Sequence, residues 1–220
     1  EVRELYVSSA APARFLRANA SLAHNVQWSD LVFSWFGGLH ALLPFTLGRM
    51  FGRKCVVVAS GYDVGDMPEI DYGNMRPGVR RKIGRRVFAL ADRVLAVSEF
   101  TRNEAIRNAG VPASKIEVIA HGLDPQKFRL PVNGKRARQV LTVGGATEGT
   151  VRTKGLGDFI RVAAQMPEVI FLVVGPQDES VVRDLSGTAS PNIQFLGPLY
   201  GDALIQIMQQ STVYTQLSVL

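Results

Sequence analysis

The stretch 91–128 constrains the fold of this chain most, because it contains signals for a strand, a helix and a second strand in close succession. A β-prone apolar run at 93–97 precedes Ser98, a residue type that suits a helix N-cap. Gly110 and Pro112 then end the predicted helix. A second apolar run follows directly. A strand, helix and strand in this order are typical of a parallel α/β sheet.

The same alternation of apolar runs and helical segments continues along the chain. Strands that alternate with helical patterns of about 10–15 residues indicate β-α-β units. The expected fold class is therefore α/β, with parallel sheets and helices packed against them. The predicted strands are Leu5–Ser8, Leu31–Ser34, Cys55–Ala59, Val94–Val97, Glu117–Ile119, Val140–Val143, Ile170–Val174, Ile193–Phe195 and Val213–Thr215. The predicted helices are Pro12–Ala23, Leu39–Phe51, Pro77–Ala91, Glu99–Asn108, Gly155–Gln165, Glu179–Leu185 and Asp202–Gln209.

One segment, residues 125–138, separates two sets of such elements. It contains two prolines, one glycine and five cations, with little apolar content. This composition is typical of a linker that crosses a protein surface. We therefore expect two domains, residues 1–124 and residues 139–220, joined by this linker.

Bulk composition limits the class of protein and its partners. The chain has 220 residues, 46% of them hydrophobic and 20% charged, as in ordinary soluble globular proteins. A net charge of +6 favours anionic partners. Cys55 is the one cysteine, which excludes an internal disulfide and favours a reducing compartment. The uncharged run 31–48 contains two glycines in a row and Pro44, so we expect a buried strand there and not a membrane span.

The loop after the predicted strand 140–143 has the residue types of an anion site. Gly144 and Gly145 permit close approach of a ligand to the backbone. Arg152 and Lys154 precede the next helix, whose N-terminus favours negative charge. A nucleoside diphosphate needs both features. The residues alone leave open the alternative of a solvated cationic loop with turn glycines.

Two other predicted strands end in residues that suit a ligand site. Gly175 ends a fully apolar strand, and the predicted strand in the first domain is followed by Gly61, Tyr62 and Asp63. Ligands of open parallel sheets lie at the carboxyl ends of the strands. A hydroxyl and a carboxylate at that edge suit the recognition of sugar hydroxyls. The alternatives are a turn glycine, a packing tyrosine and an aspartate that caps its own loop.

A cationic segment at 76–86 places six cations within eleven residues. The apolar side of the helix predicted there consists of Val79, Ile83, Val87, Phe88 and Leu90. Such a helix suits an anionic membrane surface, with a solvated helix face as the alternative. Nucleic acid is not expected as a partner, because no aromatic stacking platform accompanies the charge.

No metal site and no dinucleotide site are expected. His24, His40 and His121 are too scattered to form a ligand set, and the acidic residues at 66–71 fit no metal-binding spacing. A dinucleotide-binding oxidoreductase is a weak alternative, since no G-x-G-x-x-G motif follows any predicted strand.

The residue pattern of the stretch 91–128 resembles the sequence signature at the end of the first domain of retaining glycosyltransferases of family four. These are GT-B enzymes, which move a sugar from a nucleotide carrier to an acceptor. The residues that match are Ala91, Asp92, Val97, Ser98, Glu99, Gly110, Lys115, Ile116, Val118, Ile119, Gly122, Asp124 and Phe128. The second half resembles their donor-binding domain at Val143–Gly145, Lys154–Gly155, Phe159–Ile160, Leu172–Gly175, Val181–Asp184 and Asn192–Gly197.

The resemblance implies a role for each candidate residue on the donor side. Lys154 would contact the donor phosphates, and Arg152 would replace a family arginine whose place Gly145 takes here. Gly144, Gly145 and Gly175 would line the donor site. The backbone at Phe195 and Leu196 would hold the nucleobase. The co-substrate would be a UDP- or GDP-linked sugar, with no further cofactor and no metal.

The resemblance also implies an acceptor side and a location. Residues 1–124 would form the acceptor-side Rossmann-like domain, where Gly61, Tyr62 and Asp63 face the transferred sugar or the acceptor. Residues 139–220 would form the donor-side domain. The acceptor would be a glycan or a lipid-linked molecule. The expected location is the cytoplasm, at the inner face of the membrane, with contact through Arg76–Arg86.

The ends of the chain depart from the family pattern. The glycine-rich first loop is missing, and so is the Glu-x-Phe-Gly segment that follows the strand VYTQLS in relatives. We therefore expect both Rossmann-like domains to be incomplete. Two alternatives remain besides a glycosyltransferase: a catalytically inactive fragment that binds nucleotide sugars, and a GT-B sugar-nucleotide epimerase.

Overall fold

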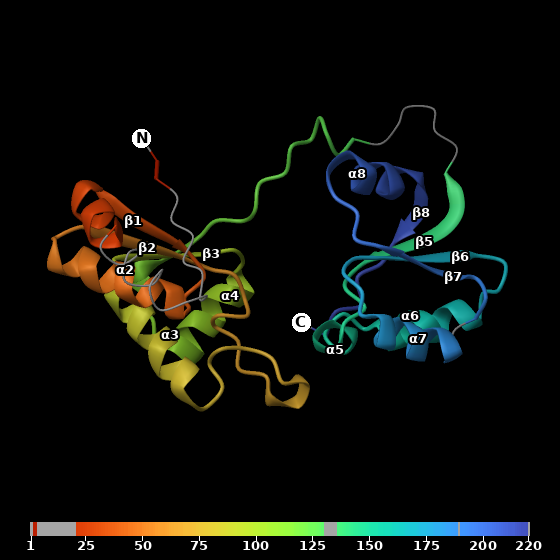
Figure 1. The fold of residues 1–220 in the computed structure, drawn as a ribbon, viewed down its shortest axis with the longest axis horizontal. Coiled ribbons are helices and arrows are strands. Elements are labelled where there is room, and N and C mark those ends of the chain that lie inside the picture. The colour runs from red at the N-terminus through yellow and green to blue at the C-terminus, as the bar shows by residue number, and fades with distance from the viewer. Residues whose placement is uncertain (1, 4–20, 130–135, 189, 220) are drawn as a thin grey trace. The chain divides into compact units, whose positions relative to one another are not determined.

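The chain folds into two compact units, Glu1–Gly122 and Leu123–Leu220. The computed structural model describes residues 2–3, 21–129, 136–188 and 190–219 (Figure 1). Each unit contains one four-stranded parallel sheet with helices against it, which confirms the predicted α/β class with two Rossmann-like domains. The predicted strand 5–8 lies outside the described residues. Of the predicted helix 12–23 only the end is described, within a helix at 21–28.

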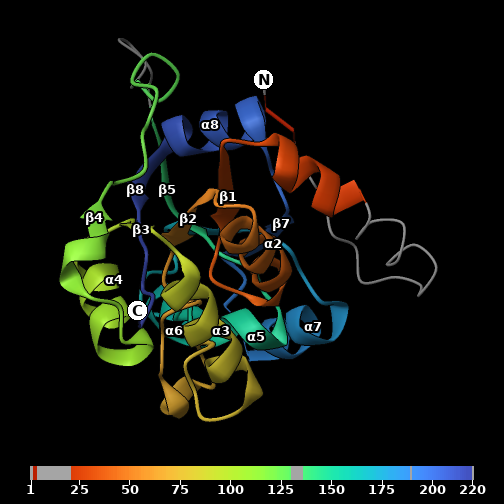
Figure 2. The same ribbon diagram turned by 90° about the vertical axis from the view of Figure 1, so that its left-hand side faces the viewer.

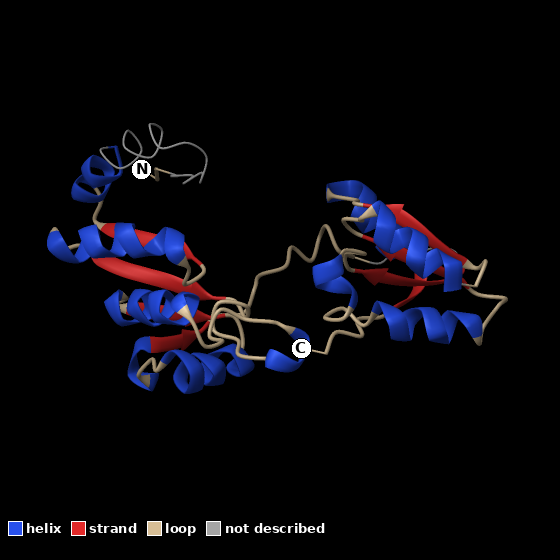
Figure 3. Ribbon diagram, turned by 60° about the horizontal axis from the view of Figure 1, so that its bottom comes forward, coloured by secondary structure: helices blue, strands red, loops and turns tan. Residues whose placement is uncertain are grey.

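The sheet of the first unit has the strand order β1-β2-β3-β4, so each strand pairs with its neighbour in sequence. Its strands are β1 (Leu31–Trp35), β2 (Lys54–Ala59), β3 (Arg93–Ala96) and β4 (Ile116–Val118). Its main helices are α2 (Leu39–Met50), α3 (Val79–Leu90) and α4 (Glu99–Glu104). A helix follows each of the first three strands, as Figure 3 shows by colour. Helix α2 lies toward β1 and α4 toward β4 (Figure 2).

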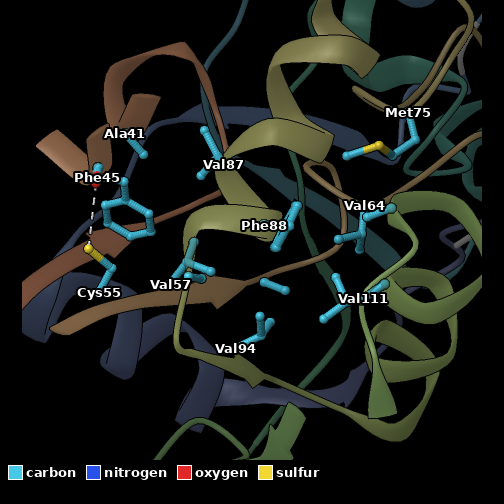
Figure 4. Close-up of a cluster of buried hydrophobic side chains, with 14 residues drawn as sticks. Ala41, Phe45, Cys55, Val57, Val64, Met75, Val87, Phe88, Val94 and Val111 are labelled. Atoms are coloured by element: carbon cyan, nitrogen blue, oxygen red, sulfur yellow. Dashed lines mark hydrogen bonds between the residues drawn. The ribbon is translucent and has the colours of Figure 1, made fainter. Parts of the chain in front are cut away.

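The core of the first unit lies between the sheet and these three helices. Phe45 of α2 and Phe88 of α3 pack onto Val57 of β2 and Val94 of β3, and all four side chains are fully buried (Figure 4). Burying each phenylalanine contributes roughly 1.5–3 kcal/mol. This packing fixes the helices on one face of the sheet and places all four strand ends at one edge.

Helix α4 begins and ends as its sequence predicts. The Ser98 hydroxyl accepts a hydrogen bond from the Thr101 N–H at 3.1 Å, which confirms the predicted N-cap. The helix continues as a π-helical turn, Ala105–Ala109, and ends at Gly110 with φ of 72°. The cap thus connects the carboxyl end of β3 directly to a helix.

The sheet of the second unit has the order β7-β6-β5-β8. Its strands are β5 (Ala137–Val143), β6 (Ile170–Val174), β7 (Ile193–Gly197) and β8 (Ser211–Tyr214). Its helices are α5 (Glu148–Val151), α6 (Leu156–Ala164), α7 (Glu179–Thr188) and α8 (Gly201–Gln210). Helices α6 and α7 cover one face of this sheet and α8 the other (Figure 1). Strand β5 begins inside the segment 125–138 that composition predicts as a linker.

The cysteine gives a test of the first core. Cys55 is fully buried, and burial raises the pKa of its thiol to about 11, with Asp92 adding to the shift. Because only the thiolate reacts, we expect Cys55 to resist a disulfide reagent in the folded protein at about pH 8 and to react at once in urea. The measurement is the absorbance of the released thiolate. Rapid labelling without denaturant would contradict this packing.

Candidate functional site

Lys154 lies at the carboxyl end of β5 in the second unit. A side-chain carbon built on Gly144 would lie 3.3 Å from both Cβ and Cγ of Lys154, so the lysine stem runs along the glycine. Lys154 is half-buried, and no ion pair to it is recorded within the described part of the chain. A partly buried cation for which the described residues show no carboxylate partner, beside a glycine at a strand end, suits an anionic ligand.

Gly175 supports this strand end from the neighbouring strand. Its φ is 148°, and a Cβ on it would lie 2.7 Å from the Gly144 carbonyl oxygen. Only glycine permits that approach. The Gly144 N–H donates to the Val174 carbonyl at 2.8 Å, and the Gly175 N–H donates to Gly197 at 2.9 Å. The backbone of three strand ends is thereby held together at this edge of the sheet.

The loop between Gly145 and Lys154 is ordered by threonines. The Thr150 hydroxyl bonds the Gly145 carbonyl, and Thr147 and Thr150 form a capping box on α5. Arg152 follows α5 and is exposed. The structure thus brings Gly144, Gly145, Lys154 and Gly175 together.

A hollow of about 750 Å³ opens where β6 and β7 end. The side chain of Phe195 packs into the core with α6 and α7, whereas Leu196 is 38% exposed. The pairing register shifts between Val173 and Val174, which leaves Leu196 without a partner in β6. Sequence reasoning gave no ligand role to the residues that line this hollow, although Val182 and Arg183 lie in a stretch that resembles the family. The lining residues are Pro176, Gln177, Glu179, Val182, Arg183 and Pro198.

Asp63 lies below the surface of the first unit. It is 1% exposed, and its two carboxylate oxygens accept hydrogen bonds from the N–H groups of Gly37 and Ser60, each at 2.9 Å. Burial raises the pKa of this carboxyl, and these N–H groups oppose the shift without cancelling it. Asp63 therefore joins the loops that follow β1 and β2. We call this the Asp63 bridge.

Tyr62 lies next to the Asp63 bridge and is 41% exposed. Its ring packs edge-on against Tyr72, with 5.0 Å between the ring centroids. Gly61 has φ of 117° and its carbonyl accepts the N–H groups of Val64 and Gly65. Tyr62 also lines a polar hollow of about 360 Å³ together with Arg76 and Arg80.

The apolar side of the cationic segment has the expected residues, but it faces the core and not a membrane surface. Ile83, Val87, Phe88 and Leu90 pack into the core of the first unit, because α3 lies on the sheet and on α2. Val79 alone of the predicted apolar side is well exposed, at 72%. The Arg85 guanidinium donates to the Asn108 carbonyl. Of the other cations, Arg80, Lys82 and Arg86 are exposed, whereas Arg76 pairs with Asp71 and the Nε of Arg81 is buried.

The described residues contain neither a metal-binding cluster nor a membrane-spanning helix. No three His, Cys, Asp or Glu side chains gather there as a metal site would require. None of the helices described is both long enough and apolar enough to cross a membrane.

Comparison with known proteins identifies the family. The model of Glycosyltransferase Family 4 matches residues 3–127, more than half of the chain, and the chain belongs to this family. A search of the curated proteins gave no match.

Solved structures show the same fold. Anabaena HepE, solved with UDP and glucose, superposes with a TM-score of 0.75 at 16% identity over 96% of this chain. S. aureus TarM, solved with fondaparinux, α-GlcNAc-glycerol and UDP, gives 0.67 at 11% identity over 91% of this chain and 40% of its own. The UDP-GlcNAc 2-epimerase of Neisseria meningitidis gives 0.54 at 13% identity over 94% of this chain and 61% of its own. The chain spans 59% of the length of HepE.

The Asp63 bridge gives a test by substitution. In Asp63→Asn the amide nitrogen would face one of the two backbone N–H donors, leaving a buried donor without an acceptor. We expect the free energy of unfolding to fall by about 1–3 kcal/mol, measured by urea denaturation. An unchanged value would show that the bridge is not formed.

The same bridge predicts a pH dependence. Because the pKa of Asp63 is raised in the folded protein, the folded state binds this proton more tightly than the unfolded chain does. The resulting stabilisation is complete below the ordinary aspartate pKa of about 3.9 and is lost as the pH rises through the raised value. Urea denaturation across the acidic range should show this loss in the wild type and not in Asp63→Asn.

Proposed function

We propose that this chain is the nucleotide-sugar-binding part of a glycosyltransferase. The observation that carries the proposal is the position of Lys154 against Gly144 at the carboxyl end of β5, in a chain of this family. The donor would be a UDP- or GDP-linked sugar, and the binding of UDP by HepE and TarM supports the former. Residues 139–220 would form the donor side, residues 125–138 the linker and residues 1–124 the acceptor side.

The proposed reaction is transfer with retention by displacement from the same face of the sugar. As the glycosidic bond breaks, negative charge develops on the leaving diphosphate. The Lys154 ammonium and the Gly145 N–H stabilise that charge, whereas the Gly144 N–H is taken up by the Val174 carbonyl. Arg152 adds a second cation. The hollow that opens where β6 and β7 end receives the nucleobase. Its lining residue Pro176 follows Gly175 in sequence, and its lining residue Pro198 lies two residues after Leu196.

The acceptor is a glycan or a lipid-linked molecule, and it approaches the first unit at Gly61 and Tyr62. In this proposal Asp63 does not bind the sugar directly. Since both of its oxygens accept backbone N–H groups below the surface, it positions the loops that meet the acceptor.

Removing the charge of Lys154 tests the donor site. In Lys154→Met the stem that packs on Gly144 is kept and the ammonium is lost. We expect the Kd for UDP, measured by calorimetry beside GDP and ADP, to rise about 10- to 100-fold, as the loss of a hydrogen bond to a charged group implies. The control is Lys127→Met, which removes an exposed lysine of the same unit. Equal binding by both variants would contradict the assignment.

Product analysis separates the alternatives. A glycosyltransferase releases nucleoside diphosphate and extends an acceptor, whereas an epimerase returns an altered nucleotide sugar. An inactive fragment binds the donor and forms neither product. The match of the Glycosyltransferase Family 4 model to residues 3–127 favours the first.

The cations of α3 support contact with an anionic membrane at the cytoplasmic face. Arg80, Lys82 and Arg86 are exposed, and the apolar side of the helix is occupied by the core. The contact is therefore electrostatic, without insertion of the helix. Each cation near such a surface contributes about 1 kcal/mol.

Charge reversal tests this contact. The triple variant Arg80→Glu, Lys82→Glu and Arg86→Glu should no longer sediment with phosphatidylglycerol vesicles, and wild-type sedimentation should decline with added salt. A control with the same net charge reverses Lys127, Arg138 and Arg161 instead. If both triple variants lose binding equally, net charge alone explains the result and the proposed surface is wrong.

A further inference from the structure

Phe36 has a backbone conformation that a phenylalanine rarely adopts. It follows β1 directly and has φ of 68°, in the left-handed region. A bulky residue there is a conformational outlier, and such outliers persist only where the surroundings determine them. Glycine would fit this position without strain. The presence of a phenylalanine at this position therefore needs a physical explanation.

The turn around Phe36 is fixed by several hydrogen bonds. The Phe36 N–H donates to the Val58 carbonyl at 3.1 Å, and the Ser34 hydroxyl donates to the Phe36 carbonyl at 3.3 Å. The next residue, Gly37, donates to the buried Asp63 carboxylate. A Cβ on Gly37 would lie 2.5 Å from the ring of Phe88, so the backbone here rests directly on the core.

Packing does not explain the ring. Phe36 is 46% exposed, and within the described part of the chain it contacts no other aromatic ring. Its neighbour Trp35 is stacked on His121 with 6.2 Å between centroids. The structure thus keeps a strained residue whose side chain is only half covered.

The Asp63 bridge brings a second exposed aromatic residue to the same edge of the sheet. Its carboxylate joins Gly37, the residue after Phe36, to the loop that contains Tyr62. The Tyr62 ring is held on one side by Tyr72 and is 41% exposed. Phe36 and Tyr62 therefore extend from two adjacent loops that one buried group holds rigid.

We propose that Phe36 and Tyr62 form an aromatic platform that binds a sugar ring of the acceptor. The C–H face of a pyranose is apolar and packs on an aromatic ring, while the Tyr62 hydroxyl can bond a sugar hydroxyl. A ring held in place by the backbone loses little entropy when it binds. This inference rests on the proposed function, because it names the chemistry of the acceptor.

The test uses the full chain and four methyl glycosides: α-glucoside, α-galactoside, α-mannoside and N-acetyl-β-glucosaminide. Saturation-transfer NMR identifies which of them binds, and titration gives the Kd. In Phe36→Asn, whose side chain tolerates the left-handed region, we expect binding to weaken about tenfold. The unfolding temperature should stay the same or rise, whereas a merely structural role would lower it. Phe128→Asn, at another half-exposed phenylalanine, should bind as the wild type does.

A second variant separates this inference from the donor site. Lys154→Met should retain glycoside binding, because the platform belongs to the first unit. Tyr62→Phe should keep part of the affinity and Tyr62→Ala little. Unchanged affinity in Phe36→Asn, or no binding of any of the four glycosides by the wild type, would overturn the platform. Either result leaves the UDP test of the proposed function intact.

Discussion

The carboxylate of Asp63 determines how the first unit presents its strand ends. It is almost without solvent contact and bonds two backbone N–H groups from loops 26 and three residues away in sequence. Burying a carboxyl is costly unless its hydrogen bonds are made, and here the two loops supply them. Without this group, the turn at Phe36 would lose its link to the loop after β2 and would keep only the hydrogen bond from the Phe36 N–H to the Val58 carbonyl among the contacts to β2 described above. The shape of the predicted acceptor edge therefore depends on one side chain that does not reach the surface.

The second unit joins its strand ends by backbone contact instead. Gly144 and Gly175 approach so closely that neither a carboxylate nor any other side chain fits between them. Within the part of the chain that the structure describes, no ion pair to Lys154 is recorded beside this contact. The two units thus join their strand ends in different ways: through a buried carboxyl group in the first unit and through direct backbone contact in the second.

The sequence predicts the elements well and their contacts poorly. The Ser98 cap, the strands and the order of helices follow from local patterns, because a cap or a strand depends on residues close in sequence. The role of Asp63 depends on Gly37, which lies 26 residues away. The sequence correctly predicts that α3 has an apolar side. It does not show that this side packs against the sheet, because that depends on tertiary contacts. No local signal distinguishes Phe36 from an ordinary residue before a glycine pair.

Strain at Phe36 and burial of Asp63 are coupled. A left-handed phenylalanine is unfavourable by itself. The turn persists because the Asp63 bridge, the Gly37 contact with Phe88 and the hydrogen bonds of Phe36 to Val58 and Ser34 hold it in place. The packing of the core of the first unit offsets this conformational strain, and the phenylalanines and valines of that core also position α2 and α3. The stability of the core thus keeps the loops of Phe36 and Tyr62 rigid, although both side chains are partly exposed. Such rigidity is what a site needs if it must hold an acceptor in one orientation during transfer.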